Sequence, residues 1–91
     1  GKGNDSLDGE EGNDLLKGED GNDYIVGNTG DDSLYGGNGN DTMYGKEGKD
    51  LLVGEAGSDY YNGGEGDDVL EVGDGGDGVA SSPGNDIIKG K

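Results

Sequence analysis

The chain has 91 residues, of which 25% are hydrophobic and none is Cys, His, Phe or Trp, and its 22 acidic and 6 basic residues give a formal net charge of −16. This length allows one small domain, and the missing cysteine and histidine exclude disulfides, zinc sites with thiolate or imidazole ligands, and Ser-His-Asp or Cys-His catalytic groups within it. Low apolar content with high charge is typical of disordered chains, so this chain needs help from outside to fold, and its acidity favours cations over nucleic acid as partners.

Aspartate recurs every nine residues along the whole chain, two residues after a glycine and two residues before an apolar residue. We number each unit so that the aspartate is position six, which puts glycine at position four and the apolar residue at position eight in all ten units. The aspartates are Asp5, Asp14, Asp23, Asp32, Asp41, Asp50, Asp59, Asp68, Asp77 and Asp86. The apolar residues are Leu7, Leu16, Ile25, Leu34, Met43, Leu52, Tyr61, Leu70, Val79 and Ile88. Ten copies in phase predict a repeat architecture.

Positions seven to nine of each unit predict a short strand, because side chains alternate across a strand and only position eight is always apolar. In chain order the predicted strands are residues 6–8, 15–17, 24–26, 33–35, 42–44, 51–53, 60–62, 69–71, 78–80 and 87–89. Positions one to six predict a tight loop rich in glycine. Position five is mostly Asn, Asp or Gly, residues that tolerate left-handed backbone. Glycine every few residues argues against helix.

A strand with one inward side chain needs neighbours, which stacking supplies. Loop, strand, loop and strand make one coil of 18 residues, and successive coils pair in parallel about 4.8 Å apart. Odd units then form one sheet and even units the other, so the ten units predict an all-β, two-sheet solenoid of about five coils. We expect one domain over residues 1–91.

Stacking also aligns the position-six aspartates in two columns, one of odd units and one of even units. Like charges one coil apart repel by about 1 kcal/mol in water and several-fold more at lower dielectric, so the columns favour a cation between neighbours. Carboxylate and carbonyl oxygens at flexible spacing suit Ca²⁺, and Mg²⁺, with its strict octahedral geometry, is the weaker candidate. Four gaps in each column of five would hold up to eight ions.

The units resemble the RTX (repeats-in-toxin) family, whose consensus is G-G-x-G-x-D-x-U-x. Residues 36–44 (GGNGNDTMY) and 63–71 (GGEGDDVLE) fit every position, and the resemblance covers essentially the whole chain. It implies a right-handed parallel β-roll with Ca²⁺ held between loops one coil apart. The first loop would give its aspartate and the carbonyls of positions two and four. The next loop would give its aspartate and the carbonyls of positions one and three.

Residue by residue, the resemblance implies the following backbone carbonyl ligands. Positions one and four supply Gly3, Gly12, Gly18, Gly21, Gly27, Gly30, Gly36, Gly39, Gly45, Gly48, Gly54, Gly57, Gly63 and Gly66. Positions two and three supply Gly1, Glu10, Glu19, Asp20, Asn28, Thr29, Gly37, Asn38, Lys46, Glu47, Glu55, Ala56, Gly64 and Glu65. Val72, Asp74, Ser81 and Pro83 would complete the last sites. The last two repeats (72–89) are degenerate, since Val72 and Ser81 replace glycine at position one and Gly78 weakens the ninth strand.

The resemblance further implies a calcium-binding module that is disordered without Ca²⁺ and folds outside the cell. It would be part of a larger secreted bacterial protein, similar to type I-secreted toxins, proteases, lipases and adhesins. Its partners would then be calcium ions and the rest of the parent protein. We expect no catalysis within this chain, because nothing breaks the repeat to form a pocket.

An alternative function is an adhesin or recognition surface that binds a partner, or ice, through one flat sheet face. The outward positions of the odd strands carry Tyr24, Val26, Tyr44 and Tyr60, and those of the even strands carry Leu15, Tyr35, Leu51, Val53, Val69 and Ile87. Apolar patches on a solenoid can mark a docking surface. β-propensity and cross-strand packing explain these residues equally simply, and we favour that interpretation.

Overall fold

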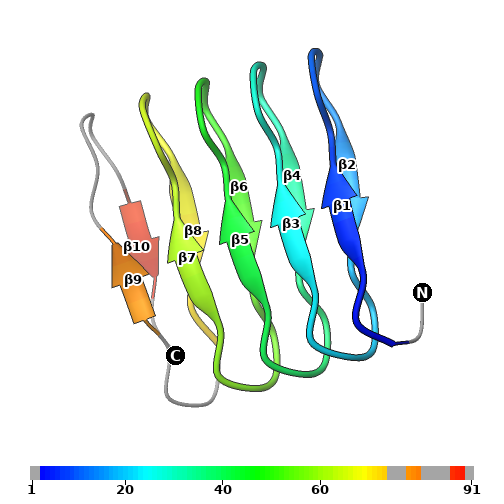
Figure 1. The fold of residues 1–91 in the computed structure, drawn as a ribbon. Coiled ribbons are helices and arrows are strands. Elements are labelled where there is room, and N and C mark those ends of the chain that lie inside the picture. The colour runs from blue at the N-terminus through cyan, green and yellow to red at the C-terminus, as the bar shows by residue number, and fades with distance from the viewer. Residues whose placement is uncertain (1–2, 74–77, 81–86, 90–91) are drawn as a thin grey trace.

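The computed structural model describes residues 3–73, 78–80 and 87–89, and within these residues the only regular elements are ten three-residue strands (Figure 1). The strands are β1 (Ser6–Asp8), β2 (Leu15–Lys17), β3 (Tyr24–Val26), β4 (Ser33–Tyr35), β5 (Thr42–Tyr44), β6 (Leu51–Val53), β7 (Tyr60–Asn62), β8 (Val69–Glu71), β9 (Gly78–Ala80) and β10 (Ile87–Lys89). All ten fall where the nine-residue period predicts them, which confirms the all-β prediction.

The strands form two parallel sheets of five, in the orders β1-β3-β5-β7-β9 and β2-β4-β6-β8-β10. Each residue pairs with the residue 18 positions later, for example Ile25 with Met43 and Leu34 with Leu52. The chain therefore winds alternately through the two sheets and stacks coil on coil, as Figure 1 shows. The result is a two-sheet parallel solenoid of about four turns, consistent with the predicted β-roll.

Backbone hydrogen bonds continue past both ends of each short strand. The N–H of Thr42 at position seven donates to the carbonyl of Asp23, and the N–H of Gly45 at position one donates to the carbonyl of Asn62, each at 2.8 Å. The parallel ladder thus extends into the loops. Because of these bonds, three-residue strands hold one fixed register, and the loops of neighbouring coils are aligned as closely as the strands.

The core is a single line of position-eight side chains between the two sheets. Ile25, Leu34, Met43, Leu52, Tyr61 and Leu70 are each at most 2% exposed. The position-eight residues of the outermost coils are less covered, and Val79 and Ile88 are 37% and 52% exposed. Because each nine-residue unit buries only one apolar side chain, interactions between the loops must contribute the rest of the stability of the fold.

Within the described ranges, no helix is long and apolar enough to cross a membrane.

Candidate metal centre

The loops adopt left-handed backbone at two positions, two and four. Position four is always glycine, with φ near +100°, as at Gly39 (104°) and Gly48 (108°). Position two is left-handed even where it is not glycine. The non-glycine residues with positive φ, between 65° and 71°, are Glu10, Glu19, Asn28, Lys46 and Glu55. This conformation costs a residue with a β-carbon about 1–2 kcal/mol, so stacking must compensate the loop for it.

Position five does not use the left-handed backbone that its residues tolerate, since no described position-five residue has positive φ. Asn and Asp occur there because their side chains accept hydrogen bonds. The Oδ1 atom of Asn22 accepts from the backbone N–H of Asn40, and the Oδ1 atom of Asn40 accepts from that of Ser58, each at 2.8 Å. These side-chain hydrogen bonds between successive position-five residues form a ladder along each edge. On the other edge the ladder ends at Lys49, because the Lys49 backbone N–H donates to Asp31 but the Lys49 side chain has no acceptor atom. The recurrence of side-chain acceptors at this position was the signal that could have revealed the ladder.

Each position-six aspartate from Asp23 to Asp68 directs one carboxylate oxygen at the preceding coil. The Oδ1 atom of Asp41 accepts a hydrogen bond of 2.8 Å from the backbone N–H of Asp23, and that of Asp50 accepts one of 2.8 Å from Asp32. The same bond, 2.8 or 2.9 Å long, links Asp5 to Asp23, Asp14 to Asp32, Asp41 to Asp59, and Asp50 to Asp68. The aspartates therefore stand in two columns, one along each edge of the solenoid.

The other carboxylate oxygen, Oδ2, is buried and accepts no hydrogen bond in most of the described position-six aspartates. Near the Oδ2 of Asp59 lies the Tyr61 hydroxyl group, since a β-carbon on Gly54 would overlap both. The Oδ2 atoms that are buried and accept no hydrogen bond are those of Asp14, Asp23, Asp32, Asp41 and Asp50. A β-carbon built on Gly45 would lie 2.6 Å from the Oδ2 of Asp50 and 2.7 Å from the carbonyl oxygen of Gly63, in the next coil. Residue 45 must therefore be glycine for lack of space, and a carboxylate and a carbonyl oxygen from consecutive coils face the same point.

The carbonyls of positions two and four point along the stack toward the following coil. A β-carbon on Gly39 would overlap the carbonyl oxygen of Gly21, and one on Gly37 would overlap that of Glu19. These carbonyls belong to the earlier of two consecutive loops, which is the side from which the predicted ligand set takes positions two and four. Nothing in the described contacts places the carbonyls of position three, so their role stays a prediction.

Some predicted ligands lie outside the described residues, namely Gly1, Asp74, Asp77, Ser81, Pro83 and Asp86. Within the described part of the chain, no group of three or more acidic side chains converges on one point. A cation site there can draw only one or two carboxylates from neighbouring loops and must take its remaining ligands from backbone carbonyls. An all-oxygen donor set of this kind suits a hard cation such as Ca²⁺.

Burial makes the aspartate columns electrostatically unfavourable when no cation is present. The pKa of Asp41 is raised to about 7, mainly by burial and further by the charges of Asp59 and Asp23, although the backbone hydrogen bond from Asp23 lowers it. The pKa of Asp50 is also raised to about 7, and that of Asp32 is raised, in both cases chiefly by burial. A divalent cation between coils would oppose these effects and favour the ionised carboxylates.

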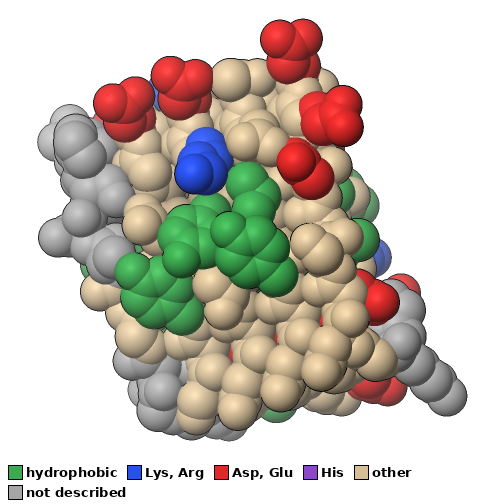
Figure 2. Space-filling model, viewed as in Figure 1, with side chains coloured by type: hydrophobic (Ala, Val, Ile, Leu, Met, Phe, Trp, Pro, Cys, Tyr) green, Lys and Arg blue, Asp and Glu red, His purple; other side chains and the backbone are tan. Residues whose placement is uncertain are grey.

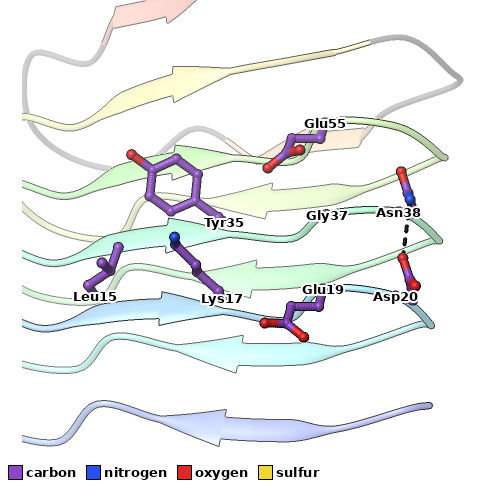
Figure 3. Close-up of a pocket in the computed structure, with 8 residues that line it drawn as sticks. All are labelled: Leu15, Lys17, Glu19, Asp20, Tyr35, Gly37, Asn38 and Glu55. Atoms are coloured by element: carbon purple, nitrogen blue, oxygen red, sulfur yellow. Dashed lines mark hydrogen bonds between the residues drawn. The ribbon is translucent and has the colours of Figure 1, made fainter. Parts of the chain in front are cut away.

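A separate recess of about 610 Å³ lies on the outward side of the even-strand sheet (Figure 3). It is lined by Leu15, Lys17, Glu19, Asp20, Tyr35, Gly37, Asn38 and Glu55. Gly37 has no side chain between those of Glu19 and Glu55, and the gap helps to open the recess. No position-six aspartate lines the recess, but five of its residues are also predicted carbonyl ligands, namely Glu19, Asp20, Gly37, Asn38 and Glu55.

Comparison with known families gives one match that spans nearly the whole chain. The sequence model of a family described as RTX calcium-binding nonapeptide repeat matches in four copies, over residues 1–34, 17–52, 35–70 and 53–88. No characterised protein and no solved structure matches the chain significantly. RTX repeats form a structural calcium-binding domain that is not catalytic. The repeat and the two-sheet solenoid agree with this match, and the chain belongs to the RTX calcium-binding nonapeptide-repeat family.

Proposed function

We propose that this chain is a folding module that is disordered without Ca²⁺ and becomes a β-roll when calcium links consecutive coils. The observation that carries the proposal is the set of buried Oδ2 atoms that accept no hydrogen bond, in Asp14, Asp23, Asp32, Asp41 and Asp50. Buried carboxylate oxygens without donors strongly destabilise a folded chain unless a cation neutralises them. The whole of residues 1–91 would act as one unit, with repeats 72–89 contributing least.

Each ion would lie between two loops that are 18 residues apart. In a central site the earlier loop would supply the Asp41 carboxylate with the carbonyls of Gly37 and Gly39. The later loop would supply the Asp59 carboxylate with the carbonyls of Gly54 and Ala56. Two carboxylates and four carbonyls give six oxygens, within the range of about 6–8 that Ca²⁺ takes. The same arrangement in every gap of both columns would bind up to about eight ions.

Calcium-dependent folding fits a chain that is exported before it folds. RTX repeats are typical of secreted bacterial proteins. Where free Ca²⁺ is scarce, the acidic chain would stay open, and where Ca²⁺ is abundant, binding would supply the free energy of folding. A type I-secreted bacterial protein would gain from this switch, since the repeats would pass the membrane unfolded and fold outside. A catalytic or adhesive activity would then belong to another part of the parent protein.

Circular dichroism tests the switch directly. At pH 8, far-UV spectra should show a disordered chain in EDTA and a β-rich chain after excess CaCl₂ is added. MgCl₂ at the same concentration should produce much less β-structure, because Mg²⁺ gives up its bound water reluctantly. Equal β-content in EDTA and in CaCl₂ would rule the switch out, and equal responses to the two metals would rule out selectivity for calcium.

A further inference from the structure

Three tyrosines form a continuous cluster on the outward face of the odd-strand sheet. Tyr24 on β3, Tyr44 on β5 and Tyr60 on β7 lie in three consecutive coils. The ring centroids of Tyr24 and Tyr44 are 5.6 Å apart, and those of Tyr44 and Tyr60 are 6.0 Å apart. Tyr24 and Tyr60 are 47% and 38% exposed. Figure 2 shows this apolar surface at the centre of the face, and we call the three residues the tyrosine cluster.

The cluster surrounds a short side chain. Strand register pairs Thr42 with Tyr24 on one side and with Tyr60 on the other, and Tyr44 is two residues beyond Thr42 on the same strand. Two rings therefore flank Thr42 along the stack, about 10 Å apart at the spacing of two coils, and a third lies beside it. The ring planes are tilted by 57° and 60° to their neighbours, so the cluster is not a flat platform.

The cluster already holds one cation of its own chain. The Lys46 Nζ atom lies 5.6 Å from the centroid of the Tyr44 ring, within the range of a cation–π interaction. Acidic side chains line the edge of the same face in Figure 2, and Asp8, Glu10, Glu47 and Glu65 are exposed in or next to the loops that follow the odd strands. The rings thus offer local attraction for cations, and the acidic edge raises the concentration of cations around them.

We propose that the tyrosine cluster is a docking site for an extended segment of a protein partner that carries Lys or Arg at alternate positions. Side chains on one face of an extended segment are about 7 Å apart, close to the spacing of the rings, so two cations two residues apart could each lie over a ring. A second copy of this chain is a poorer occupant, because the exposed Asp8, Glu10, Glu47 and Glu65 next to the cluster would face the same acidic side chains of the other copy.

Fluorescence titration with a synthetic peptide tests the proposal. The probe is a nine-residue peptide of alternating glycine and arginine, and its control is the same peptide with neutral citrulline in place of arginine. The titration is made in excess CaCl₂ and 150 mM NaCl. Three proteins are compared: the parent chain, a triple Tyr→Leu variant at 24, 44 and 60, and a triple Tyr→Phe variant at the same positions. All three have the same net charge, and circular dichroism establishes that each is folded.

The arginine peptide should bind the parent and the Phe variant equally within about twofold. Each exposed cation–π contact contributes a factor of about two to five in affinity, so the Leu variant should bind about fivefold or more weakly. The citrulline peptide should bind all three proteins weakly. Equal binding of the arginine peptide to parent and Leu variant, equal binding of the two peptides, or no binding up to 1 mM peptide would each overturn the proposal. A dimer in sedimentation that is lost in the Leu variant would overturn it in favour of a second copy.

A matched pair of charge variants provides an independent measurement. Lys46→Gln removes the cation from the Tyr44 ring, whereas Lys17→Gln makes the same charge change on the other sheet. Lys46→Gln should therefore bind the arginine peptide about twofold more tightly than Lys17→Gln does. Equal affinities of the two variants would mean that net charge alone attracts the peptide, and the proposal would fail.

Discussion

Replacing a position-one glycine by alanine should close one calcium site while leaving the backbone unstrained. Gly45 lacks the positive φ of the position-two and position-four residues, so alanine has no conformational penalty there. Its β-carbon would, however, lie 2.6 Å from the Oδ2 of Asp50 and 2.7 Å from the carbonyl oxygen of Gly63. Both contacts are far inside van der Waals distance, and both atoms are oxygens that face the proposed ion.

The magnitude follows from overpacking together with the lost ion. Overpacking of a tight site typically costs about 1–3 kcal/mol, so the free energy of unfolding of Gly45→Ala in excess calcium should fall by at least that amount. Gly78→Ala is the matched control. There the nearest atom to a new β-carbon, Cδ1 of Tyr60, is 3.4 Å away, which is ordinary contact. Because glycine weakens a strand by about 0.5–1 kcal/mol relative to alanine, the control should be slightly stabilised.

Urea unfolding in excess CaCl₂ measures the stability of both variants, and metal analysis by mass spectrometry counts the bound ions. Gly45→Ala should lower the urea midpoint and remove about one ion per chain, whereas Gly78→Ala should keep the parent's ion count. The reasoning would be refuted if Gly45→Ala bound as many ions as the parent with unchanged stability.

Three further predictions concern the same columns and loops. In calorimetry, Asp41→Ala should lose more bound Ca²⁺ and more stability than Asp5→Ala, because the Asp41 carboxylate would bind ions on both sides of its coil. Equal losses in the two variants would count against shared carboxylate ligands. Asp41 and Asp50 have pKa values raised from 3.8 to about 7, so the folded chain binds more protons than the unfolded chain between these values. In EDTA, the free energy of unfolding should therefore be greatest below about pH 4 and should fall as the pH rises toward 7. Circular dichroism should accordingly show β-content at pH 5 that is absent at pH 8. The same spectrum at both pH values would contradict this prediction. Glu19→Gly should raise the urea midpoint in calcium, because a φ of 70° strains a residue with a β-carbon by about 1 kcal/mol. The control Glu47→Gly, at a position without positive φ, should not raise it. A lower midpoint for Glu19→Gly would show that the strain is absent.

The nine-residue period was sufficient to predict the strands, their pairing and the core. Each unit repeats one apolar residue between two outward ones, so a residue such as Met43 can face only the interior, and the 18-residue coil pairs it with Ile25 and Tyr61. A slip by one residue would expose every core side chain, which is why register could be predicted from spacing alone.

The loop conformation could not be predicted in the same way, because stacking overrides local preference there. Glutamate disfavours left-handed backbone, yet Glu10, Glu19 and Glu55 adopt it where the ladder of neighbouring loops requires it. Asparagine at position five was assigned to backbone tolerance, whereas its side chain accepts a hydrogen bond from the next coil, as Asn40 does from Ser58. The tyrosine cluster was visible in the sequence as outward residues, but the distances between its rings depend on rotamers that spacing does not determine.

Anomalous diffraction from crystals grown in CaCl₂ tests most directly whether calcium joins the coils. We predict calcium peaks between loops 18 residues apart, each within bonding distance of a position-six carboxylate, with the central peak between Asp41 and Asp59. Density for water alone in those positions, in a chain that stays compact after exhaustive chelation, would contradict the account.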